Sequence, residues 1–377
     1  MSRSILIVAG ETSGDILGAA IIGQFKKLSA EKYAFWGFGG STMNQAGIEI
    51  TKDIQELSVI GFWEAIINYR RLSNYLDKLV IEAQKKKITA AILIDYPGFN
   101  LKLAEKLSAF NIPVYQVVSP QVWAWHFSRI YKIKKFIKAV LCLYKFELNI
   151  YKEKGIPATF IGHPIVQKVN DFKHKHKIEI TKIKKNLKNI KKIALLPGSR
   201  TSEIKRHLPF LIDAAIQFNK KHPETIFEIP SASDHTSKLI KEYGLPEFVS
   251  VRSDAPYITL ATSDSGIVCS GTATLECALF NLPFLLIYKT SWLTYFLGKR
   301  LIKLPYIGLV NILNNGFITK EFIQSDMKSK PVLNELEKIN YDHMYIKNMI
   351  HAFDKVKAEV SSKNPAITAA QFFIKNL

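Results

Sequence analysis

Five short turns in the sequence combine glycine, hydroxyl, acidic or basic side chains directly after apolar runs that are typical of β-strands. They read GETSGD at residues 10–15, IDYPGFN at 94–100, VSPQVWAWH at 118–126, LPGSR at 196–200 and SGTATLEC at 270–277. Small residues let a backbone approach a ligand, and the N-terminus of a following helix offers unpaired N–H groups to an anion. We therefore expect anion-binding chemistry at several strand ends.

The first two turns supply acids. Asp95 ends a fully apolar run, and ligands of open α/β sheets bind beyond the carboxyl ends of strands. A carboxylate there can take a proton from an attacking hydroxyl. Glu11 is expected to be a buried acid at a strand end, which favours a functional role. Two plainer interpretations stay open: Asp95 as a turn former before Pro-Gly, and Ser13 or Asp15 as an ordinary helix N-cap.

The last two turns favour a nucleotide diphosphate. Arg200 follows a Gly-Ser turn, and an arginine binds phosphate oxygens in a fork. Gly271 and Thr272 follow a buried run and open a helix, which suits a phosphate, and Glu276 can accept from sugar or ribose hydroxyls. The plainer alternative for the last turn is a helix capped by Thr272 with a glutamate nearby.

The third turn runs into a segment that is both aromatic and basic. Residues 126–138 hold five lysines or arginines and no acid, directly after two of the five tryptophans. Such a segment suits a lipid interface or single-stranded nucleic acid, and core tryptophans beside a solvated basic helix are the plainer interpretation. A second stretch, residues 61–72, reads as a helix apolar over more than one face, which indicates either burial or contact with lipid.

Apolar runs alternating with helical patterns must position these turns, and this alternation predicts parallel α/β sheets. Strands are expected at residues 4–9, 90–95, 113–118, 138–144, 159–162, 192–196, 225–230, 247–251 and 265–270. The alternation of strand and helix patterns is interrupted at residues 171–192, where nine lysines fall in 22 residues, and it resumes after them. We expect four parts: an N-terminal Rossmann-like domain (1–170), a basic linker (171–192), a second Rossmann-like domain (193–340), and C-terminal helices (341–377) that pack across the domains or against a partner subunit.

Bulk properties narrow the class of protein. The chain has 377 residues, 47% hydrophobic residues and a net charge of +20, which is typical of a globular protein with anionic partners. Cys142, Cys269 and Cys277 form no CxxC pair, which predicts buried thiols in a reducing compartment. The first apolar run is too short for a signal peptide, and the longest apolar window, at 277–288, is interrupted by Asn281 and Pro283. A cytoplasmic protein, peripheral on the inner face of the cytoplasmic membrane, is expected.

The motifs together resemble the lipid-A-disaccharide synthase family. AGETSGD, GFGG, ELSVIGFWE, IDYPGFN, VSPQVWAW, FIGHP, LLPGSRTSEI and SGTATLE occur in the family's order over residues 5–325. The resemblance implies a GT-B fold, two Rossmann-like domains facing each other across a cleft. It also implies an inverting glycosyltransferase that needs no metal or other cofactor. The implied substrates are UDP-2,3-diacylglucosamine and 2,3-diacylglucosamine 1-phosphate, joined as a β-1,6 disaccharide with release of UDP.

The resemblance assigns some site residues by position, and the motif turns themselves add others. Those matched by position are Asp95, Arg200, Gly271, Thr272, Ala273, Glu276, Asn311, Glu321, Gln324 and the helix that begins at Phe62. Asp95 matches an essential acid and is the candidate base, with Glu11 as a second catalytic acid. Candidate acceptor and phosphate-loop residues are Ser13, Gly14 and Asn100. Candidate donor residues are Ser199, Arg200, Gly271, Thr272, Ala273, Glu276, Asn311, Glu321 and Gln324. Candidate membrane or acyl contacts are Phe62, Trp63, Ile66, Ile67, Tyr69, Arg70, Arg71, Trp123, Trp125, Arg129 and Lys132. Where many relatives carry a second aspartate after Asp95, this chain has Gly98, which argues against a two-carboxylate mechanism.

Other functions fit parts of the pattern. A UDP-sugar 2-epimerase of the same fold would share the phosphate turns but would not need the aromatic surfaces. A nucleic-acid binder would explain the charge and the tryptophans, yet no RNP-type or helix-turn-helix signature supports it, so no nucleic-acid partner is expected. A homodimer is a further expectation, based on the helical C-terminus.

Overall fold

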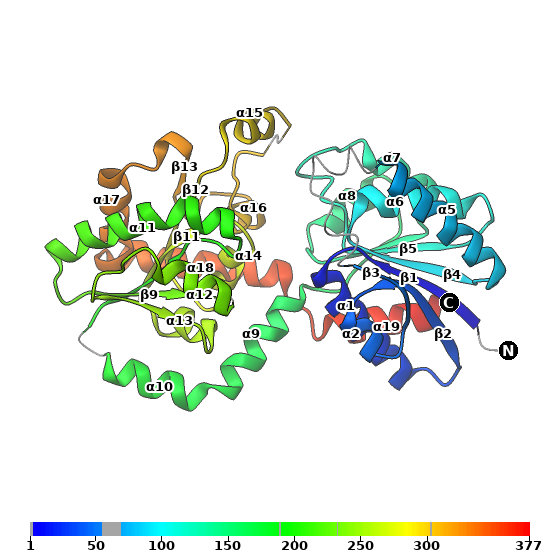
Figure 1. Ribbon diagram of the computed structural model, residues 1–377, viewed down its shortest axis with the longest axis horizontal. Coiled ribbons are helices and arrows are strands. Elements are labelled where there is room, and N and C mark those ends of the chain that lie inside the picture. The colour runs from blue at the N-terminus through cyan, green and yellow to red at the C-terminus, as the bar shows by residue number, and fades with distance from the viewer. Residues whose placement is uncertain (1–2, 55–68, 188–189, 232, 302–303) are drawn as a thin grey trace. The chain divides into compact units, whose positions relative to one another are not determined.

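The computed structural model describes residues 3–54, 69–187, 190–231, 233–301 and 304–377, and the chain divides into two compact units (Figure 1). Unit 1 comprises Met1–Pro164 and Val360–Leu377, and unit 2 comprises Ile165–Glu359. Each unit is built around one parallel sheet with helices on its faces.

Unit 1 holds a seven-stranded sheet in the order β3-β2-β1-β4-β5-β6-β7. Every described strand pair in it is parallel. Its elements are β1 (Arg3–Ala9), α1 (Thr12–Leu28), β2 (Tyr33–Gly39), α2 (Ser41–Gln45), β3 (Glu49–Asp53), α5 (Tyr69–Lys85), β4 (Ala90–Ile94), α6 (Pro97–Ser108), β5 (Val114–Val117), α7 (Arg129–Phe136), β6 (Ala139–Cys142), α8 (Glu147–Glu153), β7 (Ala158–Phe160) and α19 (Pro365–Asn376).

Unit 2 holds a six-stranded parallel sheet in the order β10-β9-β8-β11-β12-β13. Its strands are β8 (Lys192–Leu196), β9 (Ile226–Pro230), β10 (Val249–Arg252), β11 (Ser265–Cys269), β12 (Phe284–Tyr288) and β13 (Glu321–Ile323). Its helices are α9 (Pro164–Lys175), α10 (Lys177–Asn186), α11 (Thr201–Lys221), α12 (Asp234–Lys241), α13 (Pro256–Thr262), α14 (Thr272–Leu279), α15 (Trp292–Leu301), α16 (Leu309–Asn314), α17 (Ser329–Tyr341) and α18 (His343–Val360), with a 3-10 turn η1 (Gln324–Asp326).

The central strands of both sheets are fully buried because helices cover both faces of a parallel sheet. All five residues of β4 and all five of β11 are buried. This is the physical reason that these strands read as continuous apolar runs in the sequence. Strand β8 is buried throughout as well, although it begins with Lys192, whose ammonium pairs with the Glu228 carboxylate at 2.9 Å.

Both sheets have a point where the strand order reverses, and the functional turns lie there. In unit 1 the reversal falls between the neighbouring strands β1 and β4, and in unit 2 between β8 and β11. Ligands of open α/β sheets bind at this switch point, beyond the carboxyl ends of the strands. Four of the five motif turns follow one of these four strands.

The C-terminal helix α19 belongs to unit 1, where it packs against α1 (Figure 1). The ring of Tyr115 on β5 meets the rings of Phe372 and Phe373 edge-on, and its hydroxyl donates to the carbonyl of Asn376 at 2.8 Å. Helix α19 therefore packs into the same core as α1 and β5.

The prediction of two α/β halves with parallel sheets and a helical C-terminal segment is confirmed. All nine expected strands are present, with ends that differ by a few residues. Four strands that sequence patterns did not indicate, β2, β3, β12 and β13, extend the sheets. The segment 171–192, expected as a linker, is largely helical, since it contains the end of α9 and all of α10. The three cysteines are free and buried, as predicted.

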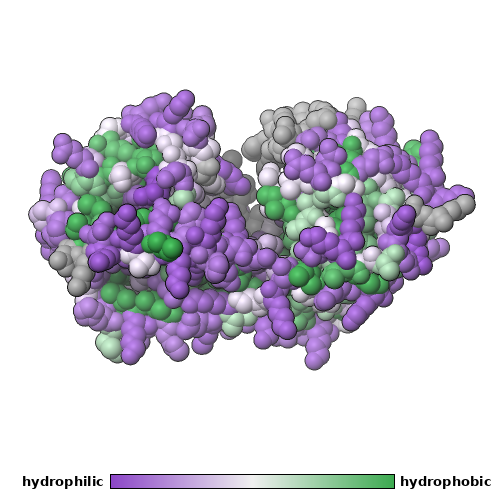
Figure 2. Space-filling model, turned by 90° about the horizontal axis from the view of Figure 1, so that it is seen from below, coloured by the Kyte–Doolittle hydropathy of each residue, from purple (hydrophilic) through white to green (hydrophobic). Residues whose placement is uncertain are grey.

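Hydrophilic residues dominate the face of the molecule shown in Figure 2, with hydrophobic residues in smaller groups among them. Within the described ranges, no helix is long and apolar enough to cross a bilayer.

Candidate functional site

Asp95 lies directly after β4 in a left-handed backbone conformation. Its φ is 51° and that of Tyr96 is 45°, values that residues other than glycine adopt rarely and at a cost of about 1–3 kcal/mol each. Such strain persists only where surrounding contacts hold the backbone in place, and it is frequent at functional sites.

Two buried amides hold the Asp95 backbone. The carbonyl oxygen of Asp95 accepts from Nδ2 of Asn100 at 2.7 Å and from Nε2 of Gln116 at 3.2 Å. The N–H of Asp95 donates to the carbonyl of Val117 at 2.9 Å. Asn100 and Gln116 are fully buried, and within the described chain their side-chain oxygens, Oδ1 and Oε1, have no hydrogen-bond partner. Asn100, expected at an acceptor loop, thus contacts the turn that carries the candidate base.

The electrostatic surroundings of Asp95 suit a base. Burial raises the pKa of its carboxyl above the ordinary range, and the negative charge of Glu11 raises it further, while a hydrogen bond from the Tyr96 N–H opposes both. A raised pKa strengthens a carboxylate as a proton acceptor near neutral pH. Glu11 itself is exposed, so the expectation that it is buried is wrong.

The GETSGD turn is anchored by Asp15. The Asp15 carboxylate is buried and accepts from the N–H groups of Gly40, Thr42 and Met43 at 2.7–3.1 Å. Neither Ser13 nor Asp15 caps its own helix, because α1 already begins at Thr12. Asp15 therefore ties the turn after β1 to the turn after β2, a role that the plainer interpretation of the motif did not include.

Close packing explains two glycines of the same turn. A Cβ on Gly10 would lie 2.3 Å from the Tyr96 ring, and one on Gly14 would lie 3.3 Å from the side chain of Ala9. Ser13 is exposed beside them. The turns after β1 and β4 are thus packed directly against each other.

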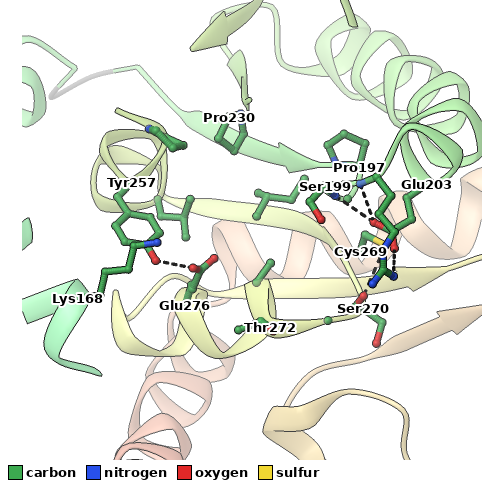
Figure 3. A pocket seen from close by; sticks show the side chains of 17 residues that line it. Lys168, Pro197, Ser199, Glu203, Pro230, Tyr257, Cys269, Ser270, Thr272 and Glu276 are labelled. Carbon is green, nitrogen blue, oxygen red and sulfur yellow. Dashed lines mark hydrogen bonds and ion pairs between the residues drawn. The ribbon is translucent and has the colours of Figure 1, made fainter. Parts of the chain in front are cut away.

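In unit 2 the turns after β8 and β11 line one pocket of about 470 Å³, a size typical of small-molecule sites (Figure 3). Six of the nine predicted donor residues line it: Ser199, Arg200, Gly271, Thr272, Ala273 and Glu276. The remaining wall comes from Lys168, Leu196, Pro197, Gly198, Glu203, Pro230, Pro256, Tyr257, Leu260, Cys269 and Ser270.

The Pro-Gly-Ser-Arg turn is wrapped around the Glu203 carboxylate. Oε2 of Glu203 accepts from the N–H groups of Ser199 at 3.0 Å and Arg200 at 3.2 Å. Gly198 has a φ of 112°, and a Cβ there would lie 2.5 Å from Glu203, so only glycine fits. The Arg200 side chain is 81% exposed and reaches Glu203 at 3.3 Å. Its guanidinium can therefore turn to an anion in the pocket at little cost.

The buried His207 holds the backbone of the same Pro-Gly-Ser-Arg turn. Nδ1 of His207 lies 2.9 Å from the carbonyl of Pro197, and Nε2 accepts from the N–H of Lys289 at 2.9 Å. Since Nε2 is an acceptor, Nδ1 carries the proton and the ring is neutral. Burial lowers the pKa of His207, which agrees with this tautomer.

The Ser-Gly-Thr turn opens helix α14 towards the pocket. Gly271 is the N-cap with a φ of 150°, and Thr272 and Ala273 are the first helical residues. Their N–H groups have no intrahelical partner, so they can bind an anion. Glu276 follows one turn later, with its Oε1 accepting from the hydroxyl of Tyr257 at 2.5 Å.

The other three predicted donor residues do not line this pocket. Asn311 is fully buried, and its Nδ2 donates to the carbonyl of Thr319 and to Glu321, both at 2.8 Å. Glu321 accepts from the N–H groups of Ile307 and Gly308. Gln324 bonds both the N–H and the carbonyl of Thr290. All three side chains hold backbone segments in place. Their expected role in binding the sugar donor remains a prediction.

The aromatic and basic segment of unit 1 divides into a buried and an exposed part. Trp123 is half-buried, and its indole N–H donates to the carboxyl of Glu147 at 3.0 Å. Trp125 is 36% exposed, with the Arg129 guanidinium 4.6 Å from its ring centre. Lys132 is exposed and pairs with Glu105 at 3.0 Å. Only the exposed part is placed to meet a surface.

The predicted contacts Phe62, Trp63, Ile66 and Ile67 lie outside the described residues, as do the side chains of Tyr69, Arg70 and Arg71. Among the residues that are described, no group of three or more His, Cys, Asp or Glu side chains could hold a metal ion.

Sequence reasoning missed several residues of these sites. Lys168 and Tyr257 line the pocket but carry no motif of their own, and Gln116 lies inside an apolar strand. Glu147 also escaped notice: it is 1% exposed, and burial raises the pKa of its carboxyl to about 7. In the sequence, the only indication of Glu147 was that it is the single acid in the run FELNIY at residues 146–151.

Comparison with known proteins adds to this geometry. The family model described as lipid-A-disaccharide synthetase matches residues 5–372. A lipid-A-disaccharide synthase of Coxiella burnetii (strain RSA 331 / Henzerling II) is 34% identical over 372 residues, which cover 98% of this chain and 97% of the relative. Lipid-A-disaccharide synthase 1 of Legionella pneumophila subsp. pneumophila (strain Philadelphia 1) is 34% identical over 361 residues, with 95% and 93% covered.

Solved structures share the fold at low sequence identity. The UDP-GlcNAc 2-epimerase from Neisseria meningitidis bound to UDP-GlcNAc superposes with a TM-score of 0.60 at 14% identity, covering 99% of both chains. The calicheamicin glycosyltransferase CalG4 gives a TM-score of 0.62 at 11% identity, covering 99% of this chain and 98% of the other. These likenesses concern the fold alone.

Proposed function

The chain belongs to the lipid-A-disaccharide synthase family of GT-B glycosyltransferases, and we propose how its two switch points divide the reaction. Unit 2 binds UDP-2,3-diacylglucosamine through its nucleotide. Unit 1 binds 2,3-diacylglucosamine 1-phosphate and supplies the base. The observation that carries this proposal is the unit 2 pocket, where a helix N-terminus, an arginine and a carboxylate meet.

The donor's diphosphate is assigned to the N-terminus of α14 and the Arg200 side chain. A diphosphate is doubly charged. It is complemented by the free N–H groups of Thr272 and Ala273 and by the exposed guanidinium of Arg200. The same groups stabilise the charge that grows on the diphosphate as it leaves. Glu276, one turn further along, accepts from the ribose hydroxyls.

Asp95 is assigned as the general base. In the proposed step the 6-hydroxyl of the acceptor attacks C1 of the donor sugar from the face opposite UDP. The hydroxyl proton passes to the Asp95 carboxylate, the new C1–O6 bond forms, and the bond from C1 to the diphosphate oxygen breaks. Its electron pair leaves with UDP, and the configuration at C1 inverts. The raised pKa of Asp95 and its strained, braced position support this assignment.

The alternative, a UDP-sugar 2-epimerase, rests on the shared fold. The epimerase structures are 11–14% identical to this chain, whereas the relatives at 31–34% identity are lipid-A-disaccharide synthases. The aromatic and basic segment of unit 1 also favours an amphiphilic substrate.

We further propose that the protein works on the inner face of the cytoplasmic membrane, with Trp125 and Arg129 against anionic lipid. An exposed aromatic ring stacked with a cation suits the membrane–water interface. The net charge of +20 favours the same surface. A homodimer formed through the C-terminal helices stays a prediction, and sedimentation of the full-length protein tests it.

Turnover by the purified protein tests the proposed reaction. The protein is incubated in detergent and EDTA with UDP-2,3-diacylglucosamine, with and without 2,3-diacylglucosamine 1-phosphate, and UDP and lipid products are followed by mass. We expect UDP release that depends on the acceptor, together with a disaccharide phosphate. UDP or an altered sugar without acceptor would contradict the proposal and favour an epimerase or a hydrolase.

Asp95→Asn separates chemistry from binding. Loss of a general base lowers turnover by about 10²–10⁴-fold, while UDP affinity in unit 2 stays as in the unaltered protein. The control is Asp77→Asn, an exposed aspartate of α5 that pairs with Lys106. Full turnover by folded Asp95→Asn protein would show that another group accepts the proton.

A further inference from the structure

Tyr257 and Glu276 form a hydrogen-bonded pair inside the unit 2 pocket (Figure 3). The Tyr257 hydroxyl, on α13, donates to Oε1 of Glu276, on α14, at 2.5 Å. Within the described chain this is the only hydrogen bond to the Glu276 side chain. A carboxylate has about four acceptor positions, so most of the acceptor capacity of Glu276 is unused, and Glu276 lines the pocket.

The Tyr257 ring is held by side chains from α9 and from the end of α14. Phe172 and Phe280 meet it edge-on, with ring centres 5.3 Å and 5.4 Å away. Lys168, on α9, places its ammonium 5.1 Å from the ring centre and also lines the pocket. The ring therefore cannot turn away without losing these contacts, and its hydroxyl stays directed at Glu276.

We propose that Tyr257 and Lys168 are positioning residues that hold Glu276 as an ionised acceptor for both ribose hydroxyls, so that the pocket selects ribonucleotides over deoxyribonucleotides. This inference rests on the proposed function, since it concerns the nucleotide half of the donor. It assigns a role to two residues that carry no sequence motif.

The acceptor geometry gives the selectivity. A ribose presents two neighbouring hydroxyl donors, and the open positions of the Glu276 carboxylate can accept both. When one hydroxyl is missing, a partly buried carboxylate is left underpaired, which costs more than the simple absence of a contact.

The Tyr257 hydrogen bond and the Lys168 charge favour the ionised state of Glu276, whereas burial opposes it. Burial raises the pKa of Glu276, and the Tyr257 hydrogen bond and the Lys168 charge oppose this rise. Burial and the Glu276 charge raise the pKa of the Tyr257 phenol, so Tyr257 remains a donor. The other charged groups that line the pocket, Arg200 and Glu203, lie on the turn after β8 and on α11.

Calorimetric titration of the full-length protein with UDP and 2′-deoxy-UDP tests the inference. We expect the unaltered protein to prefer UDP by about tenfold or more, as for a charge-assisted hydrogen bond. In Tyr257→Phe and Lys168→Met the preference should fall below about threefold, while the affinity for 2′-deoxy-UDP stays nearly unchanged. As the pH falls, UDP affinity should be lost at a higher pH in both variants, because the pKa of Glu276 rises when either partner is removed.

Two matched variants serve as controls. Tyr345→Phe removes a similar hydroxyl-to-glutamate bond, 2.7 Å long to Glu335, outside the pocket. Lys173→Met removes a cation that lies 5.0 Å from the Phe280 ring centre on the same helix as Lys168. Neither should change the preference for UDP.

The possible failures are distinguishable. Equal loss of both affinities in Tyr257→Phe, or unchanged discrimination, would overturn this inference and leave the proposed function standing. Failure of the unaltered protein to bind UDP at all would overturn both.

Discussion

Glu11 and Asp95 lie at the carboxyl ends of the neighbouring strands β1 and β4. Burial raises the pKa of the Asp95 carboxyl, and the negative charge of Glu11 raises it further. The two acids are not equivalent, because Glu11 is exposed whereas Asp95 is half-buried and held by Asn100 and Gln116. This difference supports the proposal that Asp95 accepts the proton and that Glu11 tunes the pKa of Asp95.

Glu11→Gln should shift the pH dependence of turnover. A base acts in its ionised form, so activity falls as the pH drops below the pKa of Asp95. Removing the Glu11 charge lowers that pKa, and the acidic limb of the kcat/KM profile should move down by a few tenths to about one pH unit. A loss of about 10²-fold or more at every pH would instead identify Glu11 as the base.

Arg200→Ala should lower kcat/KM for the donor by about 10–100-fold, because a charge-assisted contact to the diphosphate is lost. Arg200→Lys should recover only part of the loss, since lysine keeps the charge without the two-pronged geometry. Steady-state kinetics with varied donor measures both. The control is the exposed Lys205 on α11, the helix that follows Arg200. If Lys205→Ala lost as much as Arg200→Ala, general charge rather than a specific contact would be responsible.

Glu147 should change protonation near neutral pH. Its folded pKa of about 7 lies above the ordinary 4.5, so its stabilising effect is fully present below pH 4.5 and is lost as the pH rises through 7. At about 1.4 kcal/mol per pH unit the full loss is about 3 kcal/mol.

Infrared difference spectra between pH 6 and pH 9 test this prediction. The unaltered protein should show loss of a protonated carboxyl band that Glu147→Gln lacks. Identical difference spectra for the two proteins would contradict the raised pKa. The stability of Glu147→Gln should also vary less between pH 5 and 8 than that of the unaltered protein.

Trp125→Ala and Arg129→Gln should each weaken binding to vesicles that contain anionic phospholipid. One cation near an anionic surface contributes about 1 kcal/mol, so Arg129→Gln should reduce partitioning by about fivefold, and less at high salt. Vesicle sedimentation measures the effect. Trp292, 78% exposed on α15 of unit 2, is the matched comparison. If only Trp292→Ala weakened binding, the lipid-facing surface would lie on unit 2.

Local patterns in the sequence were sufficient for the central strands and their turns. Strands β1, β4, β8 and β11 are buried over most or all of their length, so each contains a continuous apolar run, and the polar turn after each was visible in the sequence. The glycines at Gly198 and Gly271 could be read in the same way, because both have positive φ angles, and at Gly198 a Cβ would also collide with Glu203. Edge and short strands such as β3 and β13 left no such pattern.

Only the tertiary structure decided which of these turns come together. Strand order is set by packing between distant segments, and no local period encodes that β1 pairs with β4 or that β8 pairs with β11. For the same reason the sequence could not predict that Lys168 and Tyr257, 89 residues apart, contact each other and that Tyr257 contacts Glu276. It also could not predict that Asn311 and Asp15 hold backbone segments in place. The sequence determined the kinds of chemistry at the strand ends, whereas burial and long-range hydrogen bonds decided which side chains face a ligand and which hold the backbone.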